Sequence, residues 1–501
     1  MGLSLVVIAT ACSTNLDLAP ISSISDTNYW KTADQYDAFA SGIQARFRSH
    51  NASFQALGEL RADIFGTESG NPSTFTGEAT RGLERMWLQT LDLDNTGVSN
   101  FGGFYTNIVQ INLLIDKLNT ATVVTEANKN YYLGMAYGMR AYYYFHLLRS
   151  WGKVVIQTDP ILSIDIANLS KTAASEAEVM ALIKADTKKS LNSFGNNYSF
   201  RNSKSFWSKA ATLMLKAEIS LWNSYRGGGA ADATAALNAL KEIQTNIPSL
   251  ALLPNFSTVF VASNKGNTEI IFSIRYLLNE ASMGFVSNFV PQSGLISNFF
   301  DLNGMRQFNV TTDNWGGILR APVRTSTYNK FNDLDSRKLA SIQPAFRRVG
   351  STFELAGAFT NKYQGEQNAG ARSITNDFPI YRYADLLLMI AEAKVILGQS
   401  PITELNLVRV RAFGARYDEK VHGFPNQAID AKPAEAILNE RLFEFVFEGK
   451  KWYDLRRFGN NSVFANTTLS SSEAYKLLWP IDRNSLTNNR ALTQTEGYPA
   501  F

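Results

Sequence analysis

Few side chains in this sequence have the types and spacing that catalysis or metal binding requires. The only cysteine is Cys12, so no internal disulfide can form, and the three histidines, His50, His146 and His422, lie too far apart for any common metal-ligand spacing. No phosphate-binding G-x-x-x-x-G-K-[ST] motif and no G-x-S-x-G nucleophile motif occurs. We therefore expect neither a metal ion nor a cofactor, and no Cys–His nucleophile.

Cys12 has a sequence context that points to a different chemistry, lipid attachment. The apolar stretch Leu3–Ala11 is too short to cross a bilayer and ends in small residues directly before Cys12, with polar residues following. This pattern resembles a bacterial lipobox, which predicts a signal peptide over residues 1–11 and a lipid anchor on Cys12. The alternative is a buried cysteine in an ordinary first strand.

The elements that would position a binding site are mainly helical. Apolar residues recur at three- and four-residue spacing, the period of a helix with one buried face. A nearly all-apolar segment, Asn130–Trp151, predicts a central buried helix that ends at Gly152. The other predicted helices cover Ala33–Arg48, Phe104–Leu118, Ser175–Leu191, Phe206–Tyr225, Ala230–Thr245, Arg382–Leu397 and Ala434–Phe447.

The amino-acid composition changes between residues 253 and 378. This region is rich in Asn, Ser, Gly, Thr and aromatic residues, with short strand-like runs such as Glu269–Ile274. No Gly/Ser-rich or Pro-rich linker separates it from the helices. We expect one domain over residues 12–501, with 253–378 a loop-rich α/β insertion.

Composition limits the class of partner. The chain has 501 residues, 18% charged and 12% aromatic, with a formal net charge of +4. That charge is too small for the electrostatic footprint of a nucleic-acid binder, so we expect no nucleic-acid partner.

Three blocks near the C-terminus carry a specific resemblance. They are Pro379–Ala393, Glu440–Arg457 and Leu478–Asp482 followed by Leu492–Tyr498, and they accompany Arg140–Phe145 and Arg149–Gly152. Together they resemble the SusD/RagB family of nutrient-binding outer-membrane lipoproteins of Bacteroidetes. The tail departs from the family, with Thr495-Glu496 where Asn-Pro is usual.

The resemblance implies a mainly α fold, a right-handed superhelix of tetratricopeptide-like helix pairs backing a loop-rich ligand surface. It also implies a lipid-anchored protein on the cell surface of the outer membrane, and a SusC-like TonB-dependent transporter as partner. Oligosaccharides, and in some members peptides, are the implied ligands. Catalysis is not part of the family's role.

The motif blocks themselves are expected to be scaffold. Arg382 and Asp385 lie three apart at a helix start and could pair, and Arg441, Glu444 and Glu448 have the spacing for pairs along one helix. The alternative is that Arg382 or Arg441 holds an acidic ligand.

Sugar recognition requires aromatic faces and planar polar side chains, which loops on a rigid scaffold supply. Two regions have this mixture, residues 63–87 and 303–328. The predicted ligand-binding residues are Asp63, Thr67, Glu68, Arg81, Trp87, Trp315, Arg320 and Tyr328. Trp87 and Trp315 are the expected stacking residues, and Arg81 and Arg320 the polar anchors, which would suit a sialylated glycan.

The sequence thus predicts a surface lipoprotein that captures oligosaccharides for a transporter. Three alternatives stay open: the same fold capturing peptides, a tetratricopeptide-type scaffold that binds only proteins, and a glycosidase using carboxylates near Asp63 and Glu68.

Overall fold

A computed structural model describes residues 29–66, 75, 81–97, 100–162, 170–368, 370–426, 428–430 and 432–501. The predicted signal peptide and Cys12 lie outside the described residues. The protein is mainly helical, with 53% helix and 9% strand, as expected from the sequence.

Ten helices of nine or more residues form the framework of the described part of the chain, and their order follows the predicted periodicity closely. They are α1 (Ala33–Ser49), α2 (Asn51–Glu59), α4 (Phe101–Thr120), α5 (Glu126–Trp151), α6 (Glu176–Phe194), α7 (Lys209–Asn223), α8 (Gly229–Asn246), α12 (Tyr383–Ile396), α13 (Ile402–Phe413) and α15 (Pro433–Phe445), joined by α16 (Lys451–Arg457) and α17 (Asn460–Asn466) of one to two turns. Shorter helices are α3 (Glu84–Trp87), α9 (Ser293–Ile296), α10 (Thr325–Asn329), α11 (Ser336–Ser341), α14 (Glu419–His422) and α18 (Arg483–Asn488).

Side-chain caps fix several of these helix starts. Ser175 accepts a hydrogen bond from the backbone N–H of Glu178 while the Glu178 carboxylate accepts one from the N–H of Ser175, a complete capping box at α6. At α5 the side chain of Thr125 accepts a hydrogen bond from the backbone N–H of Asn128. Gly152, with φ 73°, ends α5 where the sequence predicted.

Neighbouring helices pack as pairs, α4 with α5, α5 with α6, α7 with α8 and α12 with α13. The pairs stack in the superhelical, tetratricopeptide-like arrangement that the sequence predicted. Helix α5 is central and buried over almost its whole length from Tyr131 to Trp151. A Cβ on Gly138 would lie 2.2 Å from Nε1 of Trp207, so only glycine allows this close approach. None of the helices in the described part of the chain combines the length and apolarity of a membrane span.

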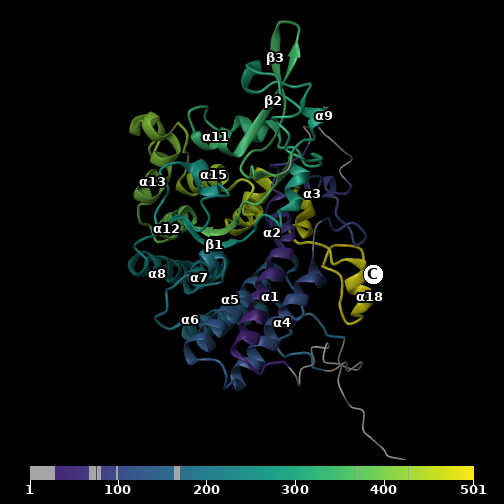
Figure 1. The fold of residues 1–501 in the computed structure, drawn as a ribbon, viewed down its shortest axis with the longest axis vertical. Helices are drawn as coiled ribbons and strands as arrows, with labels where there is room; N and C mark the ends of the chain where they lie inside the picture. The colour runs from purple at the N-terminus through teal and green to yellow at the C-terminus, as the bar shows by residue number, and fades with distance from the viewer. Residues whose placement is uncertain are drawn as a thin grey trace, which may run out of the picture.

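All six strands that the structure describes lie in or next to the predicted insertion. They form three antiparallel pairs: β1 (Ile270–Ile274) with β6 (Phe378–Arg382), β2 (Ile342–Val349) with β3 (Thr352–Thr360), and β4 (Glu366–Asn368) with β5 (Ala371–Ser373). Figure 1 shows the β2–β3 hairpin projecting from one end of the molecule, with α4, α5 and α6 at the opposite end. The insertion therefore covers one end of the helical stack.

Candidate ligand-binding surface

The two predicted ligand regions, far apart in the sequence, meet in the structure. Phe65 and Val323 form an antiparallel bridge. The N–H of Gly66 donates to the carbonyl of Pro322 at 2.9 Å, and the N–H of Arg324 donates to the carbonyl of Ile64 at 2.9 Å. The segment after α2 is thus held against the insertion by backbone hydrogen bonds.

Asp63 braces this junction. Its carboxylate pairs with Arg324 at 3.3 Å, and Nε of Arg324 also donates to the carbonyl of Phe65 at 3.1 Å. Burial raises the pKa of Asp63, although the Arg324 charge opposes that shift. Asp63 therefore helps to hold the two predicted ligand regions, residues 63–87 and 303–328, together. The predicted contacts Thr67 and Glu68 lie outside the described residues.

Two predicted aromatic contacts are interior packing residues. Trp87 is only 2% exposed, and its indole lies directly over Gly66, where an added Cβ would come within 2.7 Å of the ring. Tyr328 is 7% exposed, with the ammonium of Lys338 4.1 Å from its ring centroid. Neither ring offers a free face for a sugar, which corrects the prediction made from the loop composition.

Trp315 is different because it is half-buried, at the edge of an aromatic cluster. Its ring makes edge contacts with Phe359 at 4.9 Å and Phe308 at 5.9 Å between centroids. The guanidinium of Arg372 lies 5.8 Å from its centroid, within cation–π distance. Phe359 also packs on the predicted loop through Phe75. The structure thus supports Trp315 from behind and leaves part of its surface accessible.

Polar contacts hold the loop that carries Trp315. Arg306 pairs with Asp313 at 2.5 Å and with Asp301 at 3.2 Å. The side chain of Asn309 accepts from the backbone N–H of Thr311 at 2.8 Å. These contacts close a compact turn directly before Trp315, so the tryptophan is presented on an ordered support.

The two predicted arginine anchors remain near the surface. Arg320 is half-buried, and its Nη1 donates to the side chain of Asn288 at 3.4 Å. Arg81 is exposed, with φ 51°. Arg372, which the sequence reasoning missed, donates from Nε to the carbonyl of Asn314 at 2.9 Å. No sequence signal links it to Trp315, because the two residues lie in different hairpins and loops of the insertion.

Two family models match the chain. One, described as the SusD family, matches residues 258–498, and the other, described as "Starch-binding associating with outer membrane", matches residues 33–221. The structure of B. fragilis NanU is 43% identical in sequence, with a TM-score of 0.87, covering 96% of this chain and all of that chain. The chain belongs to the SusD family.

Other relatives from the SusD family are similar to this chain over nearly its full length. A SusD superfamily protein from Bacteroides vulgatus is 39% identical, with a TM-score of 0.85, covering 94% of this chain and 100% of that one. SusD-like protein P38 of Formosa agariphila is 26% identical over 98% of this chain and 96% of its own length. The likeness therefore extends over both the helical stack and the insertion.

The SusD-family motif residues are scaffold, as the sequence predicted, but they pair differently. Arg382 does not pair with Asp385. It lies at the end of β6, fully buried, and binds Glu269 at 2.6 Å, Glu444 at 2.5 Å and Glu448 at 2.9 Å. The predicted pairs along one helix are replaced by pairs between elements, because burial leaves each carboxylate facing a neighbouring element and not solvent.

The same network continues through neighbouring cations. Arg411 and Arg337 also bind Glu444, and Lys362 binds Glu448 at 2.8 Å. Burial alone would raise the pKa of Glu444, but the positive charges of Arg411, Arg382 and Arg337 outweigh it and hold the pKa well below its ordinary value. Arg441 is likewise enclosed, paired with Asp385 at 2.8 Å and Asp454 at 2.9 Å. Neither Arg382 nor Arg441 can reach a ligand at the surface, so the alternative of an acidic ligand there is not supported.

No group of three or more histidine, cysteine, aspartate or glutamate side chains suited to a metal ion is present among the residues the structure describes.

Proposed function

We propose that this protein is a cell-surface lipoprotein that captures oligosaccharides without altering them and delivers them to a SusC-like TonB-dependent transporter. The observation that carries the proposal is Trp315, a half-buried aromatic ring on a braced loop in a SusD-family fold. A ring of this kind stacks on the apolar C–H face of a sugar. The family description "Starch-binding associating with outer membrane" supports both the ligand class and the location.

The two predicted arginine anchors, together with Arg372, favour acidic glycans, such as sialylated host glycans, as one ligand class. Arg81 is exposed, Arg320 is half-buried, and Arg372 lies against Trp315. A guanidinium binds a carboxylate through two parallel hydrogen bonds, which a neutral sugar cannot offer. We propose lipid attachment at Cys12 as the anchor of the protein on the membrane.

Purified protein on an array of neutral and sialylated oligosaccharides tests the proposal. We expect retention with no new reducing ends. Replacement Trp315→Ala should weaken binding at least tenfold, about 1.4 kcal/mol, while the fold persists. Tyr225→Ala is a matched control, since Tyr225 is 36% exposed, packs on Phe458 and lies in the helical stack, outside the insertion.

Three outcomes would contradict this proposal. Equal affinity in Trp315→Ala and the parent protein would remove the loop from the binding site. New reducing ends would favour hydrolysis. No binding to any glycan on the array, together with binding of peptides, would favour the peptide-capturing alternative.

A further inference from the structure

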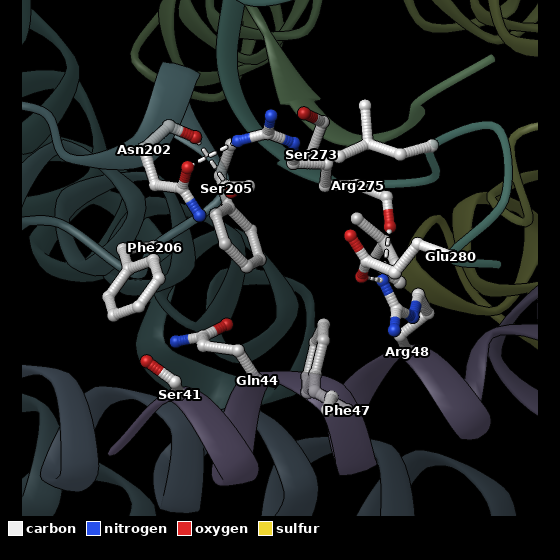
Figure 2. A pocket seen from close by; sticks show the side chains of 14 residues that line it. Ser41, Gln44, Phe47, Arg48, Asn202, Ser205, Phe206, Ser273, Arg275 and Glu280 are labelled. Atoms are coloured by element: carbon white, nitrogen blue, oxygen red, sulfur yellow. Dashed lines mark hydrogen bonds and ion pairs between the residues drawn. The ribbon is translucent and has the colours of Figure 1, made fainter. Parts of the chain in front are cut away.

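A polar cleft of about 330 Å³ lies outside the loops around Trp315. It is formed by α1, by the short η2 turn (Asn202–Lys204) with the two residues after it, and by the end of β1 with the chain that follows. Figure 2 shows Ser41 and Gln44 of α1 on one side, Phe206 and Asn202 on another, and Arg275 above them. None of its lining residues belongs to the predicted ligand regions, so its chemistry is separate.

Charge in the cleft is unbalanced toward positive. Two arginines, Arg48 and Arg275, face a single carboxylate, Glu280. Arg48 uses its Nη1 for Glu280 at 2.5 Å and for the backbone carbonyl of Arg275 at 3.2 Å. Glu280 is thus committed to Arg48, and no other carboxylate lines the cleft. Asp377, whose carboxylate interacts electrostatically with Arg275, lies outside the lining and also pairs with Lys265 at 3.9 Å.

Arg275 is also incompletely hydrogen-bonded. Its Nη1 donates to the side-chain oxygen of Asn202, but its Nε is buried and has no hydrogen-bond partner among the described residues. A buried N–H of a charged group is costly to leave unpaired. The guanidinium as a whole is half-buried, and an acceptor entering the cleft, above all a carboxylate, would bind it.

The remaining walls suit a hydroxyl-bearing ring. Ser41 is exposed, and the amide of Gln44 donates to the sulfur of Met139 at 3.2 Å, a weak acceptor that a ligand hydroxyl would improve on. Phe206 is half-buried and presents an aromatic surface beside them. The volume lies in the range of small-molecule sites.

The turn that closes the cleft is held in a rare conformation. Asn202, Ser203 and Lys204 all have left-handed backbones, with φ of 49°, 52° and 66°. The ammonium of Lys204 donates to the carbonyl of Asn267 at 2.6 Å and fastens the turn to the chain before β1. Such strain persists only where the surrounding structure over-determines it, and it is frequent at ligand clamps.

We propose that this cleft is a second ligand site, specific for a small sugar acid. The carboxylate would bind the guanidinium of Arg275, hydroxyls would bind Gln44 and Ser41, and the ring would lie against Phe206. The site is independent of the oligosaccharide capture proposed for the Trp315 loop.

Calorimetric titration of the full-length protein tests this site with D-glucuronate, D-galacturonate and N-acetylneuraminate, each at millimolar concentration. D-glucose is the matched neutral probe, since it differs from glucuronate only at the carboxylate. We expect saturable binding of at least one acid and at least tenfold weaker binding of glucose. Arg275→Gln should weaken binding of the acid at least tenfold, and Ser41→Trp should block the cleft from an exposed position of α1.

Two variants separate this site from its surroundings. Arg46→Gln makes the same charge change on an exposed residue of α1 that does not line the cleft, and it should bind the acid normally. Trp315→Ala should also bind it normally, whatever its effect on oligosaccharides. No saturable binding of any acid, or unchanged affinity in both Arg275→Gln and Ser41→Trp, would overturn the proposal, as would loss in Trp315→Ala alone.

Discussion

Replacing Arg382 with methionine tests whether the buried ion network holds the insertion on the helical stack. The guanidinium is fully buried and makes five hydrogen bonds, to the carboxylates of Glu269, Glu444 and Glu448 and to the carbonyl of Glu444. Methionine fills a similar volume and donates nothing. Arg382→Met would therefore leave three enclosed carboxylates with one cation fewer.

The expected loss follows from the burial of all partners. Removing one partner of a buried ion pair costs about 3–5 kcal/mol, because the remaining charge is uncompensated. Unfolding entropy near the melting temperature is about 2.1 cal/mol/K per residue, or about 1 kcal/mol/K for 501 residues. We therefore expect the melting temperature of Arg382→Met to fall by about 3–5 °C at pH 7, measured by scanning calorimetry.

The pH dependence supplies an independent test. Glu444 has a pKa held below its ordinary value, so its contribution to stability is present above about pH 4.5 and is lost as pH falls through the lowered pKa. In Arg382→Met the carboxylates lose a cation and take up protons at higher pH. The gap in melting temperature between the two proteins should narrow from pH 7 to pH 4.

Arg306→Met is the matched control. Arg306 also binds two carboxylates, Asp301 and Asp313, but its side chain is 51% exposed. Exposed pairs contribute about 0–1 kcal/mol, so its melting temperature should change by about 1 °C or less. If the melting temperature of Arg382→Met also fell by only about 1 °C, the reasoning would be refuted, because burial would then not increase the free-energy cost of losing the cation.

Three further predictions concern single positions. Burial raises the pKa of Glu59 to about 8, so its stabilising contribution is complete below about pH 4.5 and is lost as pH rises through 8. Glu59→Gln should therefore flatten the fall in melting temperature between pH 5 and pH 8. An unchanged slope in the variant would contradict this. A Cβ on Gly58 would lie 1.7 Å from the carbonyl oxygen of Gly449, so Gly58→Ala should lower the free energy of unfolding in urea by about 1–3 kcal/mol. Gly42 has open space around its Cβ position, so Gly42→Ala should stabilise α1 by up to about 1 kcal/mol. The reverse order of the two effects would refute the packing argument. Cys12→Ser should move the protein from the membrane pellet to the soluble fraction, and continued pelleting would disprove the anchor.

The helical stack could be predicted from sequence because its signal is local. Apolar spacing placed α5, α6 and α8 within a few residues of their ends, and capping residues such as Ser175 and Gly152 mark where helices start and stop. The strand β1 was predicted from the apolar run Glu269–Ile274. Its partner β6 was not predicted, because Phe378–Arg382 is too short to carry a strand pattern of its own, and the predicted helix began at Arg382, the last residue of β6.

The exposure of the candidate ligand residues was harder to predict, because exposure is not a local property. Trp87 and Trp315 have similar surroundings in sequence, yet one is 2% exposed and the other half-buried. What distinguishes them is a contact from elsewhere: Trp87 is covered at Gly66, while Trp315 is supported from behind by Phe359 of β3. A residue's type indicates what it can bind, and only the packing of distant segments decides whether it is accessible.

The same physics explains why the family's most recognisable residues lie away from the surface. Arg382 and Glu448 come from β6 and the turn after α15, and their buried charges are stable only if both elements keep one exact placement. That requirement ties the insertion to the helices through side chains that few other residue types could replace. The loop around Trp315 is held by its own turn contacts, such as Arg306 with Asp313, and by Phe359 and Arg372 of the insertion, and none of these residues belongs to the buried ion network. A scaffold fixed in this way allows the ligand surface to vary while the fold stays the same.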